Sequence, residues 1–212
     1  MALTVAVLGG TGNLGKQFVQ QVLAEGHSVR ALARTPAKLE PAERLEAVAG
    51  DATRAEDVAR LVAGADVVVS CLGNVGKLRV MDIAATHILA AAAAQPSPPR
   101  CVFISSVGCG GTSFIVKWML IVIGAAMGMG KGSFDDYDAA DARIRAETRV
   151  PFVLVRPYSL TDKPGTGAYH ATENQNATFM RPIARADVAR FLVDAVSDTR
   201  WDGKPGIQVG GA

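Results

Sequence analysis

The sequence has few of the residues from which metal sites and disulfide frameworks are built. It contains three cysteines and three histidines among 212 residues. Cys71, Cys101 and Cys109 are widely spaced, odd in number and without a C-x-x-C motif, so we expect buried, reduced thiols. No group of His, Cys and carboxylate residues has the spacing of metal ligands, and the sequence predicts no metal site.

The chain also lacks an excess of charge of either sign. Its formal net charge is +2, so no strong field favours nucleic acid or acidic partners. Hydrophobic residues make up 49% and charged residues 20%, as in ordinary globular proteins. The length is sufficient for one sizeable core. We expect one domain over residues 1–212 and a small-molecule substrate rather than nucleic acid.

Long apolar runs are scarce, and residues 113–130 form the one that must be weighed as a membrane span. Lys117 interrupts this run, Gly and Ser residues weaken it, and it stands between a predicted strand and a predicted helix. Because a span there would split one sheet across a bilayer, we expect no integral span. We expect an apolar lid or insertion at about 107–134, a substrate wall, or a homo-oligomer face formed by 113–130, with peripheral membrane contact as an alternative.

The amino-terminal stretch MALTVAVLGG lacks a basic region and leads straight into a glycine motif. Such a start is typical of a strand and not of a signal peptide. With neither a span nor a signal peptide expected, the sequence predicts a cytoplasmic protein.

Strand-like and helix-like runs alternate along the chain. Such alternation, with helices of about 10–15 residues, predicts an α/β fold: a single-domain, Rossmann-like, doubly wound parallel sheet with helices on both faces. Ligands of such sheets bind at the carboxyl ends of the strands. The predicted strands are 3–9, 28–34, 44–51, 65–73, 100–106, 151–157 and 206–211, and the predicted helices are 13–26, 55–64, 80–94, 135–149 and 185–198.

The glycine motif LGGTGNLG follows the first predicted strand and opens the first predicted helix. Gly9 allows a tight exit from the strand, Gly12 lets backbone approach a pyrophosphate, and Gly15 lets the helix pack closely. Free N–H groups and the helix dipole would then hold the phosphates. The motif in this context predicts dinucleotide binding, although a glycine-rich turn is the simpler alternative. The cradle would also be lined by Thr11, Asn13 and Leu14.

The end of the second strand indicates which dinucleotide is bound. An acidic residue there would bind the ribose hydroxyls of NAD. The sequence instead offers Arg34 and Lys38, and no Asp or Glu occurs from the start of this strand at Ser28 until Glu40. Because a guanidinium suits a 2′-phosphate, we expect NADP(H) rather than NAD. A solvated basic face is the alternative, above all for Arg30.

Later strand ends supply further candidate contacts. Ser105 and Ser106 close the fifth strand, where one hydroxyl could bond a substrate carbonyl or the nicotinamide amide. We assign Ser105 to the cofactor and Ser106 to catalysis, with capping of the next loop as the alternative. The remaining predicted cofactor contacts are Asp51 and Ala52 beside the adenine, and Leu72, Gly73 and Asn74 along the middle of the dinucleotide.

Several segments together carry a family resemblance, among them AVLGGTGNLG, ALARTPAKL, VVSCLGN, VFISS and VLVRPYSLTDKPGTGAY. They resemble the atypical short-chain dehydrogenase/reductase families, and most closely the NmrA-like NAD(P)-binding proteins and the flavin reductase/biliverdin reductase B group. The resemblance covers nearly the whole chain and is poorest at 107–134. It implies a Rossmann fold and use of NADP(H). A Ser and a His of the reductase group line the site; they fall on Ser106 and Tyr158, and Tyr158 keeps a ring and a hydrogen-bonding tip.

The stretch DDYDAADARIRAE departs from the Tyr-x-x-x-Lys design, because Tyr137 is followed four residues later by Asp141. A carboxylate near a phenol disfavours phenolate. The favoured role of Tyr137 is therefore a helix-start residue or a wall of the pocket, and it is kept as a candidate catalytic acid. We expect Asp141, with Asp135, Asp136 and Asp138, to cap the start of its own helix.

Three further positions complete the set of residues with an expected role. Tyr158 follows the predicted strand 151–157 and is a candidate substrate contact or proton donor. Arg156 is expected to be structural, because the residue before Pro157 is held extended. Asp187 is expected to cap the helix 185–198.

These features favour an NADPH-dependent reductase of a small, apolar or planar acceptor such as a flavin, quinone, enone or tetrapyrrole. Ser106 and Tyr158 would orient the acceptor, and Tyr158 or water would supply the proton. Two alternatives remain open at this point: a non-catalytic NADP-binding redox-sensing regulator, and a tailoring isomerase, epimerase or dehydratase.

Overall fold

The protein is described from a computed structural model, which defines residues 1–73, 79–110, 131–174 and 181–212. Side chains of residues 131–133 are not part of this description. Asn74 and the apolar segment 113–130, with the lid and oligomer face predicted there, lie outside the described residues. Among the helices that are described, none is long and apolar enough to cross a membrane.

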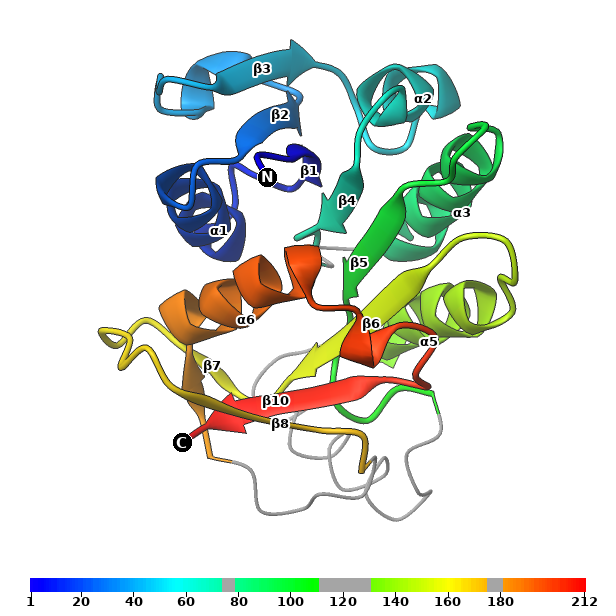
Figure 1. The fold of residues 1–212 in the computed structure, drawn as a ribbon. Helices are drawn as coiled ribbons and strands as arrows, with labels where there is room; N and C mark the ends of the chain where they lie inside the picture. Colours follow the sequence, from blue (N-terminus) through cyan, green and yellow to red (C-terminus); the bar gives the residue numbers. More distant parts are fainter. Residues whose placement is uncertain (74–78, 111–130, 175–180) are drawn as a thin grey trace.

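An eight-stranded sheet forms the centre of the described structure, and its strands are ordered β3-β2-β1-β4-β5-β6-β10-β8 from the top of Figure 1 to the bottom. The neighbouring strands are parallel except at one edge, where β8 runs antiparallel to β10. The predicted Rossmann-like sheet is confirmed. The strands are β1 (Thr4–Leu8), β2 (Ser28–Ala33), β3 (Leu45–Ala49), β4 (Val67–Ser70), β5 (Arg100–Ile104), β6 (Phe152–Pro157), β8 (Tyr169–Thr172) and β10 (Ile207–Gly211).

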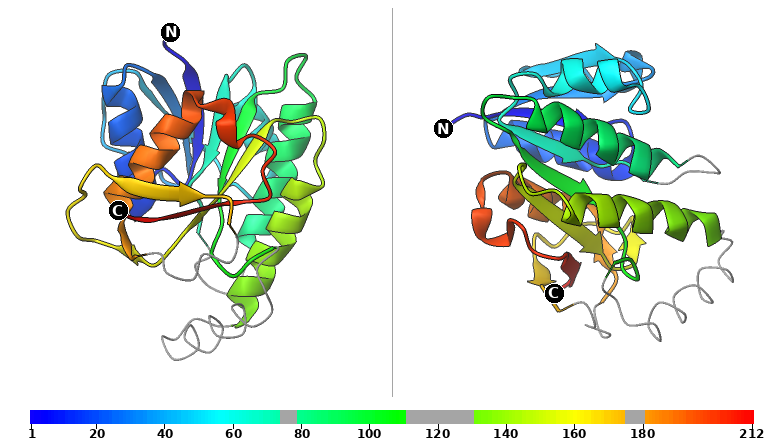
Figure 2. Two further views of the ribbon diagram at one scale, coloured as in Figure 1. Left: turned by 60° about the horizontal axis from the view of Figure 1, so that its bottom comes forward. Right: turned by 90° about the vertical axis from the view of Figure 1, so that its right-hand side faces the viewer.

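Helices cover both faces of the sheet (Figure 2). One face carries α1 (Asn13–Ala24) and α6 (Arg185–Ser197), which pack against each other. The other carries α2 (Ala55–Val62), α3 (Val80–Ala93) and α5 (Lys131–Arg145). The described part also contains two short 3₁₀ turns, η1 (Pro36–Lys38) and η2 (Thr199–Trp201), and a small separate sheet of β7 (Leu160–Thr161) and β9 (Ile183–Ala184).

Alternation along the central strands builds two hydrophobic cores, one under each helical layer. In β1, Val5 and Val7 point to the α1–α6 side, whereas Ala6 and Leu8 point to the side of α2, α3 and α5. All four are fully buried, and full burial of a Val or Leu side chain contributes about 1.5–3 kcal/mol. This double burial explains why the central strands are continuous apolar runs.

Two element predictions need correction. The helix predicted over 135–149 spans Lys131–Arg145; Phe134 is buried within it, and the Glu147 carboxylate accepts the N–H groups of Thr148 and Arg149 in a turn after it. The strands β7, β8 and β9 are missing from the sequence prediction. All three are short: β7 and β8 are partly exposed, and β9 consists of two buried residues. They therefore carry little of the apolar alternation on which strand prediction depends.

The predicted burial of the three cysteine side chains is confirmed, and none of them forms a disulfide. Burial raises the pKa of the Cys71 thiol to about 12 and also raises that of Cys101. Because the thiolate is the reactive form, these two positions are chemically inert near neutral pH.

Candidate cofactor and active site

The glycines after β1 form a cradle that larger residues would fill. Gly9 has φ +79°, and a Cβ there would lie 2.8 Å from the carbonyl carbon of Cys71. A Cβ at Gly15 would lie 2.1 Å from the carbonyl oxygen of Gly9. The Gly12 N–H donates to that same oxygen at 3.0 Å. The loop is therefore a tight backbone turn against which a pyrophosphate fits without meeting side chains.

The first turn of α1 is left without the usual protein partners of a helix start. Its N-cap is Gly12, which has no side chain to cap the N–H groups, and the first turn contains no acidic residue. By contrast, α2 has Glu56 and Asp57 in its first turn. Free N–H groups and an uncompensated dipole suit an anionic group. Thr11 and Asn13 are accessible beside this turn, whereas the Leu14 side chain is buried, so only its backbone can line the cradle.

The strand register brings the other predicted cofactor residues to the same edge. Leu8 of β1 pairs with Leu32 and Ser70, and Ala33 pairs with Ala49. The exits of four neighbouring strands therefore adjoin one another. The predicted residues at these exits are Gly9, Arg34, Asp51, Ala52, Leu72 and Gly73.

The β2 and β3 exits carry two exposed cations and one carboxylate that is already hydrogen-bonded. Arg34 and Lys38 are exposed. The Asp51 carboxylate accepts from the backbone N–H of Thr53 at 2.9 Å and from its hydroxyl at 2.8 Å. These bonds, with a smaller contribution from the Arg34 charge, hold the pKa of Asp51 below its ordinary value. The Asp51 carboxylate is thus engaged in its own loop, and the cations are the accessible charges there.

The side chain of Tyr137, a residue of α5, also lies at this edge of the sheet. A Cβ on Gly73, just after β4, would lie 3.7 Å from Tyr137 Oη. The ring packs partly buried against the core beneath α3 and α5. The structure therefore places the phenol beside a predicted cofactor contact.

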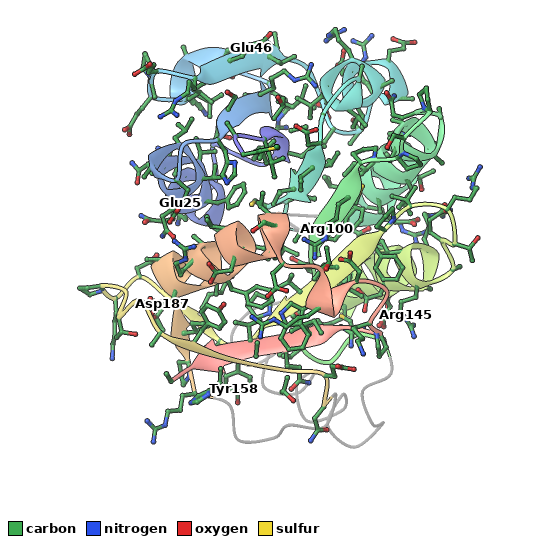
Figure 3. The ribbon with its side chains drawn as sticks, viewed as in Figure 1. Glu25, Glu46, Arg100, Arg145, Tyr158 and Asp187 are labelled. Atoms are coloured by element: carbon green, nitrogen blue, oxygen red, sulfur yellow. The ribbon has the colours of Figure 1, made fainter. Side chains whose placement is uncertain are left out.

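The exits of β5 and β6 supply the remaining candidate groups. Ser106 is half-buried, and its hydroxyl donates to the Val107 carbonyl at 3.1 Å. Tyr158, labelled in Figure 3, is half-buried just after β6, and its N–H donates to Val209 at 2.8 Å. Because β5 and β6 pair in parallel up to Ile104 and Val155, Ser106 and Tyr158 follow neighbouring strand ends.

The acidic residues of α5 bind other elements, so the prediction that they cap their own helix is wrong. Asp136 accepts from the backbone N–H groups of Met81 and Asp82 at the start of α3, both at 3.0 Å. Asp138 accepts from the Gly110 N–H at 3.1 Å. The first turn of α5 contains no acidic residue, because the helix begins four residues earlier than predicted.

Asp141 belongs to a buried ion pair with Arg156 of β6, and both side chains are 0% exposed. The Ser105 hydroxyl donates to Asp141 Oδ1 at 2.6 Å, and Arg156 also donates to the Pro205 carbonyl at 3.2 Å. Burial raises the pKa of the Asp141 carboxyl, while the Arg156 charge and the Ser105 hydroxyl oppose that rise. The contacts agree with the predicted structural role of Arg156. The direct cofactor contact predicted for Ser105 stays a prediction.

Sequence reasoning missed the partners of Asp136, Asp138 and Asp141. One signal was present: an acidic residue at the position of the usual Lys, together with an Arg directly before Pro157. Asp187 lies in the first turn of α6, as predicted. Its carboxylate accepts the Thr166 and Gly167 N–H groups at 3.1 and 2.8 Å, so it binds a neighbouring loop and the predicted capping of its own helix is wrong (Figure 3). Among the residues the structure describes, no group of three or more His, Cys, Asp or Glu could hold a metal ion.

Fold and site together define an α/β dinucleotide-binding protein. The family described as NAD(P)H-binding matches residues 9–199, and the chain therefore belongs to that family. This membership supports a nicotinamide dinucleotide as the cofactor, and the predicted resemblance is confirmed at the level of family and fold.

Known structures share the fold at low sequence identity. The oxidoreductase ylbE from Lactococcus lactis matches with a TM-score of 0.82 and 21% identity over 99% of this chain and 91% of that one. The anaerobilin reductase ChuY from Escherichia coli O157:H7 matches with a TM-score of 0.76 and 20% identity. That match covers 98% of this chain and 97% of ChuY. A protein from Streptococcus pneumoniae TIGR4, proposed to be an NADH-flavin reductase, matches with a TM-score of 0.78 and 19% identity over the full length of both chains.

A curated relative matches over a shorter stretch. A 3-beta-hydroxysteroid dehydrogenase from Mycolicibacterium neoaurum is 44% identical over 64 residues. The match covers 30% of this chain and 18% of that protein.

Proposed function

We propose that this protein is an NADPH-dependent reductase that transfers hydride to a small, apolar or planar acceptor of the flavin, quinone, enone or tetrapyrrole type. One observation carries the proposal: the edge that holds the phosphate cradle also presents the accessible residues Ser106 and Tyr158 at adjoining strand exits. Ligands of such sheets bind along this edge. Both residues end in a hydroxyl, which can donate or accept a hydrogen bond.

The choice of NADPH over NADH is supported by the charges at the β2 exit. Arg34 and Lys38 are exposed, and a guanidinium forms bidentate, charge-assisted bonds with phosphate. No acidic residue lies between Arg34 and Glu40 to take the ribose hydroxyl instead. The engaged carboxylate of Asp51 leaves these cations as the natural partners of a 2′-phosphate.

In this proposal the protein itself has only to orient the acceptor and supply a proton. When bound, NADPH supplies a hydride from its nicotinamide ring. Ser106 turns its hydroxyl from the Val107 carbonyl toward the acceptor, and Tyr158 holds the acceptor from the β6 side. Tyr158 or water donates the proton, and Tyr137 bounds the site beside Gly73, with proton donation by Tyr137 as the alternative.

The pairing of Asp141 with Arg156 favours acceptors that need little acid catalysis. The position that carries Lys in the Tyr-x-x-x-Lys design is occupied here by a carboxylate paired with Arg156, so no cation at that position activates Tyr137. Flavins, quinones and enones accept hydride with less help from an acid than simple ketones do. Two proteins of similar structure, an anaerobilin reductase and a protein proposed to be an NADH-flavin reductase, have names that agree with this class.

The proposal is tested by mixing the purified protein with NADPH and each acceptor class and following loss of reduced cofactor. We expect oxidation above the uncatalysed rate with at least one planar acceptor. Tight NADPH binding without any such oxidation would overturn the reductase and favour the redox-sensing regulator. Full activity in both Ser106→Ala and Tyr158→Phe would overturn the assigned roles.

A further inference from the structure

Two carboxylates of α5 hold the two ends of the segment that leaves β5. At one end, the Ser105 hydroxyl donates to Asp141 Oδ1 at 2.6 Å. At the other, the Gly110 N–H donates to Asp138 Oδ1 at 3.1 Å. Ser106 lies between these attachments, and its carbonyl accepts the Cys109 N–H at 3.4 Å. The geometry of the segment is thus set from α5.

The Asp141 attachment is itself rigid, because its partner Arg156 is enclosed by backbone. A Cβ at Gly110 would lie 2.2 Å from Arg156 Nη2, and a Cβ at Gly206 would lie 2.6 Å from Arg156 Cζ. Two loops therefore pass directly over the guanidinium, with room for glycine only. Arg156 also donates to the Pro205 carbonyl at 3.2 Å. The ion pair joins α5 to β6 and to the loops that precede α5 and β10.

A buried ion pair is a weak source of net stability, because the desolvation of two charges offsets most of their attraction. What a buried network of hydrogen bonds and charges does provide is a fixed geometry. Here the geometry that it fixes is the exit of β5, through the short bond to Ser105.

We propose that Asp141 is a positioning residue: through Ser105 it sets Ser106 at the acceptor site, while Asp138 holds the far end of the same segment. The inference rests on the proposed function, in which Ser106 contacts the acceptor. The position that provides a catalytic Lys in the Tyr-x-x-x-Lys design thus serves here to align a neighbouring strand end.

Ser105→Ala tests this link, because it removes the bond to the β5 exit and leaves the Asp141–Arg156 pair in place. Tyr169→Phe is the matched control: it also removes one hydroxyl-to-carboxylate bond, from Tyr169 to Asp194 at 2.7 Å, on the edge strand β8. We expect kcat to fall about tenfold in Ser105→Ala with less than about a twofold change in the KM for NADPH, since small misplacements at a reacting centre are costly. Tyr169→Phe should keep the wild-type kcat, and Ser105→Thr, which retains the hydroxyl, should restore most of the rate.

A second readout is independent of turnover. Emission from the reduced nicotinamide of bound NADPH reports the surroundings of that ring, whereas binding of adenosine 2′,5′-bisphosphate reports only the β1–β3 side. We expect Ser105→Ala to change the emission and to leave the affinity for adenosine 2′,5′-bisphosphate as in the wild type. If the wild type oxidises no NADPH, the proposed function fails, and the emission still decides the positioning role.

The inference is overturned if Ser105→Ala matches Tyr169→Phe in both kcat and emission. It is also overturned if the loss of kcat is accompanied by an equal loss of affinity for adenosine 2′,5′-bisphosphate, which would indicate a general structural defect. Should Ser105→Ala fail to fold, Asp138→Ala applies the same two readouts at the other end of the segment.

Discussion

The two halves of the ligand-binding edge differ in what shapes them: backbone in one half and buried charged side chains in the other. On the β1–β4 side, the cradle is backbone: Gly9 and Gly15 sit where no Cβ fits, and the charged groups Arg34 and Lys38 remain exposed. On the β5–β6 side, buried charged side chains hold the strand exits in place, foremost the ion pair of Asp141 and Arg156. The first half leaves backbone space and exposed charge for a ligand, whereas the second is shaped by contacts between side chains of the protein itself.

The largest expected effect on ligand binding comes from filling the backbone cradle. Gly15→Ala would bring a Cβ to 2.1 Å from the Gly9 carbonyl oxygen, so the loop must move, and NADPH should bind about a hundredfold more weakly or not at all. Gly10→Ala is the control within the same loop, because its Cβ would meet only side-chain carbons at 3.4–3.5 Å. Equal NADPH affinities of the two variants in a fluorescence titration would contradict this view of the cradle.

The next effect concerns stability on the β5–β6 side. Asp141→Asn leaves the buried Arg156 charge uncompensated, and we expect the free energy of unfolding to fall by about 3–5 kcal/mol. The pair of the exposed Arg79 with the partly buried Asp82 at 3.3 Å provides the control: Arg79→Gln removes a cation that is solvated and should cost less than about 1 kcal/mol. Urea unfolding measures both, and a similar loss in the two variants would show that the buried pair has no special role.

Cofactor preference gives a third, more moderate effect. Arg34→Ala removes a charge-assisted contact, which contributes about 1.5–3 kcal/mol, so we expect NADPH affinity to fall about 10- to 100-fold and NADH affinity to stay unchanged. Arg149→Ala removes an exposed cation near the start of β6, far from this exit, and should change neither. Equal NADPH and NADH affinities in the wild type, unaltered in Arg34→Ala, would remove the basis for NADP preference.

The smallest effect is expected at Tyr137. If its phenol bounds the site beside Gly73 and Tyr158 holds the acceptor, Tyr137→Phe should lower kcat by less than about threefold, and Tyr158→Phe by about tenfold. A loss of about a hundredfold or more in Tyr137→Phe would instead identify it as the general acid. Steady-state kinetics with one active acceptor distinguishes the two outcomes.

The β1–β4 half could be predicted from sequence because its determinants are local. Strand, glycine motif and helix are contiguous, so the positions of Gly9, Gly12 and Gly15 within them already specify a tight turn. The order of alternating strands and helices likewise specifies the parallel sheet. The short edge strands β7, β8 and β9 carry too little apolar alternation to be recognised.

The β5–β6 half could not be predicted in the same way, because its determinants are pairs of residues far apart in the chain. Nothing local to Asp136 indicates that it binds the start of α3, and nothing local to Asp141 indicates Ser105 and Arg156 as partners. Acidic residues near an expected helix start fit a cap equally well. Only the path of α5 across α3 and the strand exits decides between the two.

The central claim is that hydride leaves NADPH while an acceptor is held at the exits of β5 and β6. NADPH carrying deuterium at one or the other C4 position of the nicotinamide, oxidised by the protein with an active planar acceptor, tests it most directly. We predict that NADP⁺ formed from one stereoisomer retains all of its deuterium and that formed from the other retains none, as read by mass spectrometry. Partial retention from both, as in the uncatalysed reaction, would contradict a reductase site at this edge.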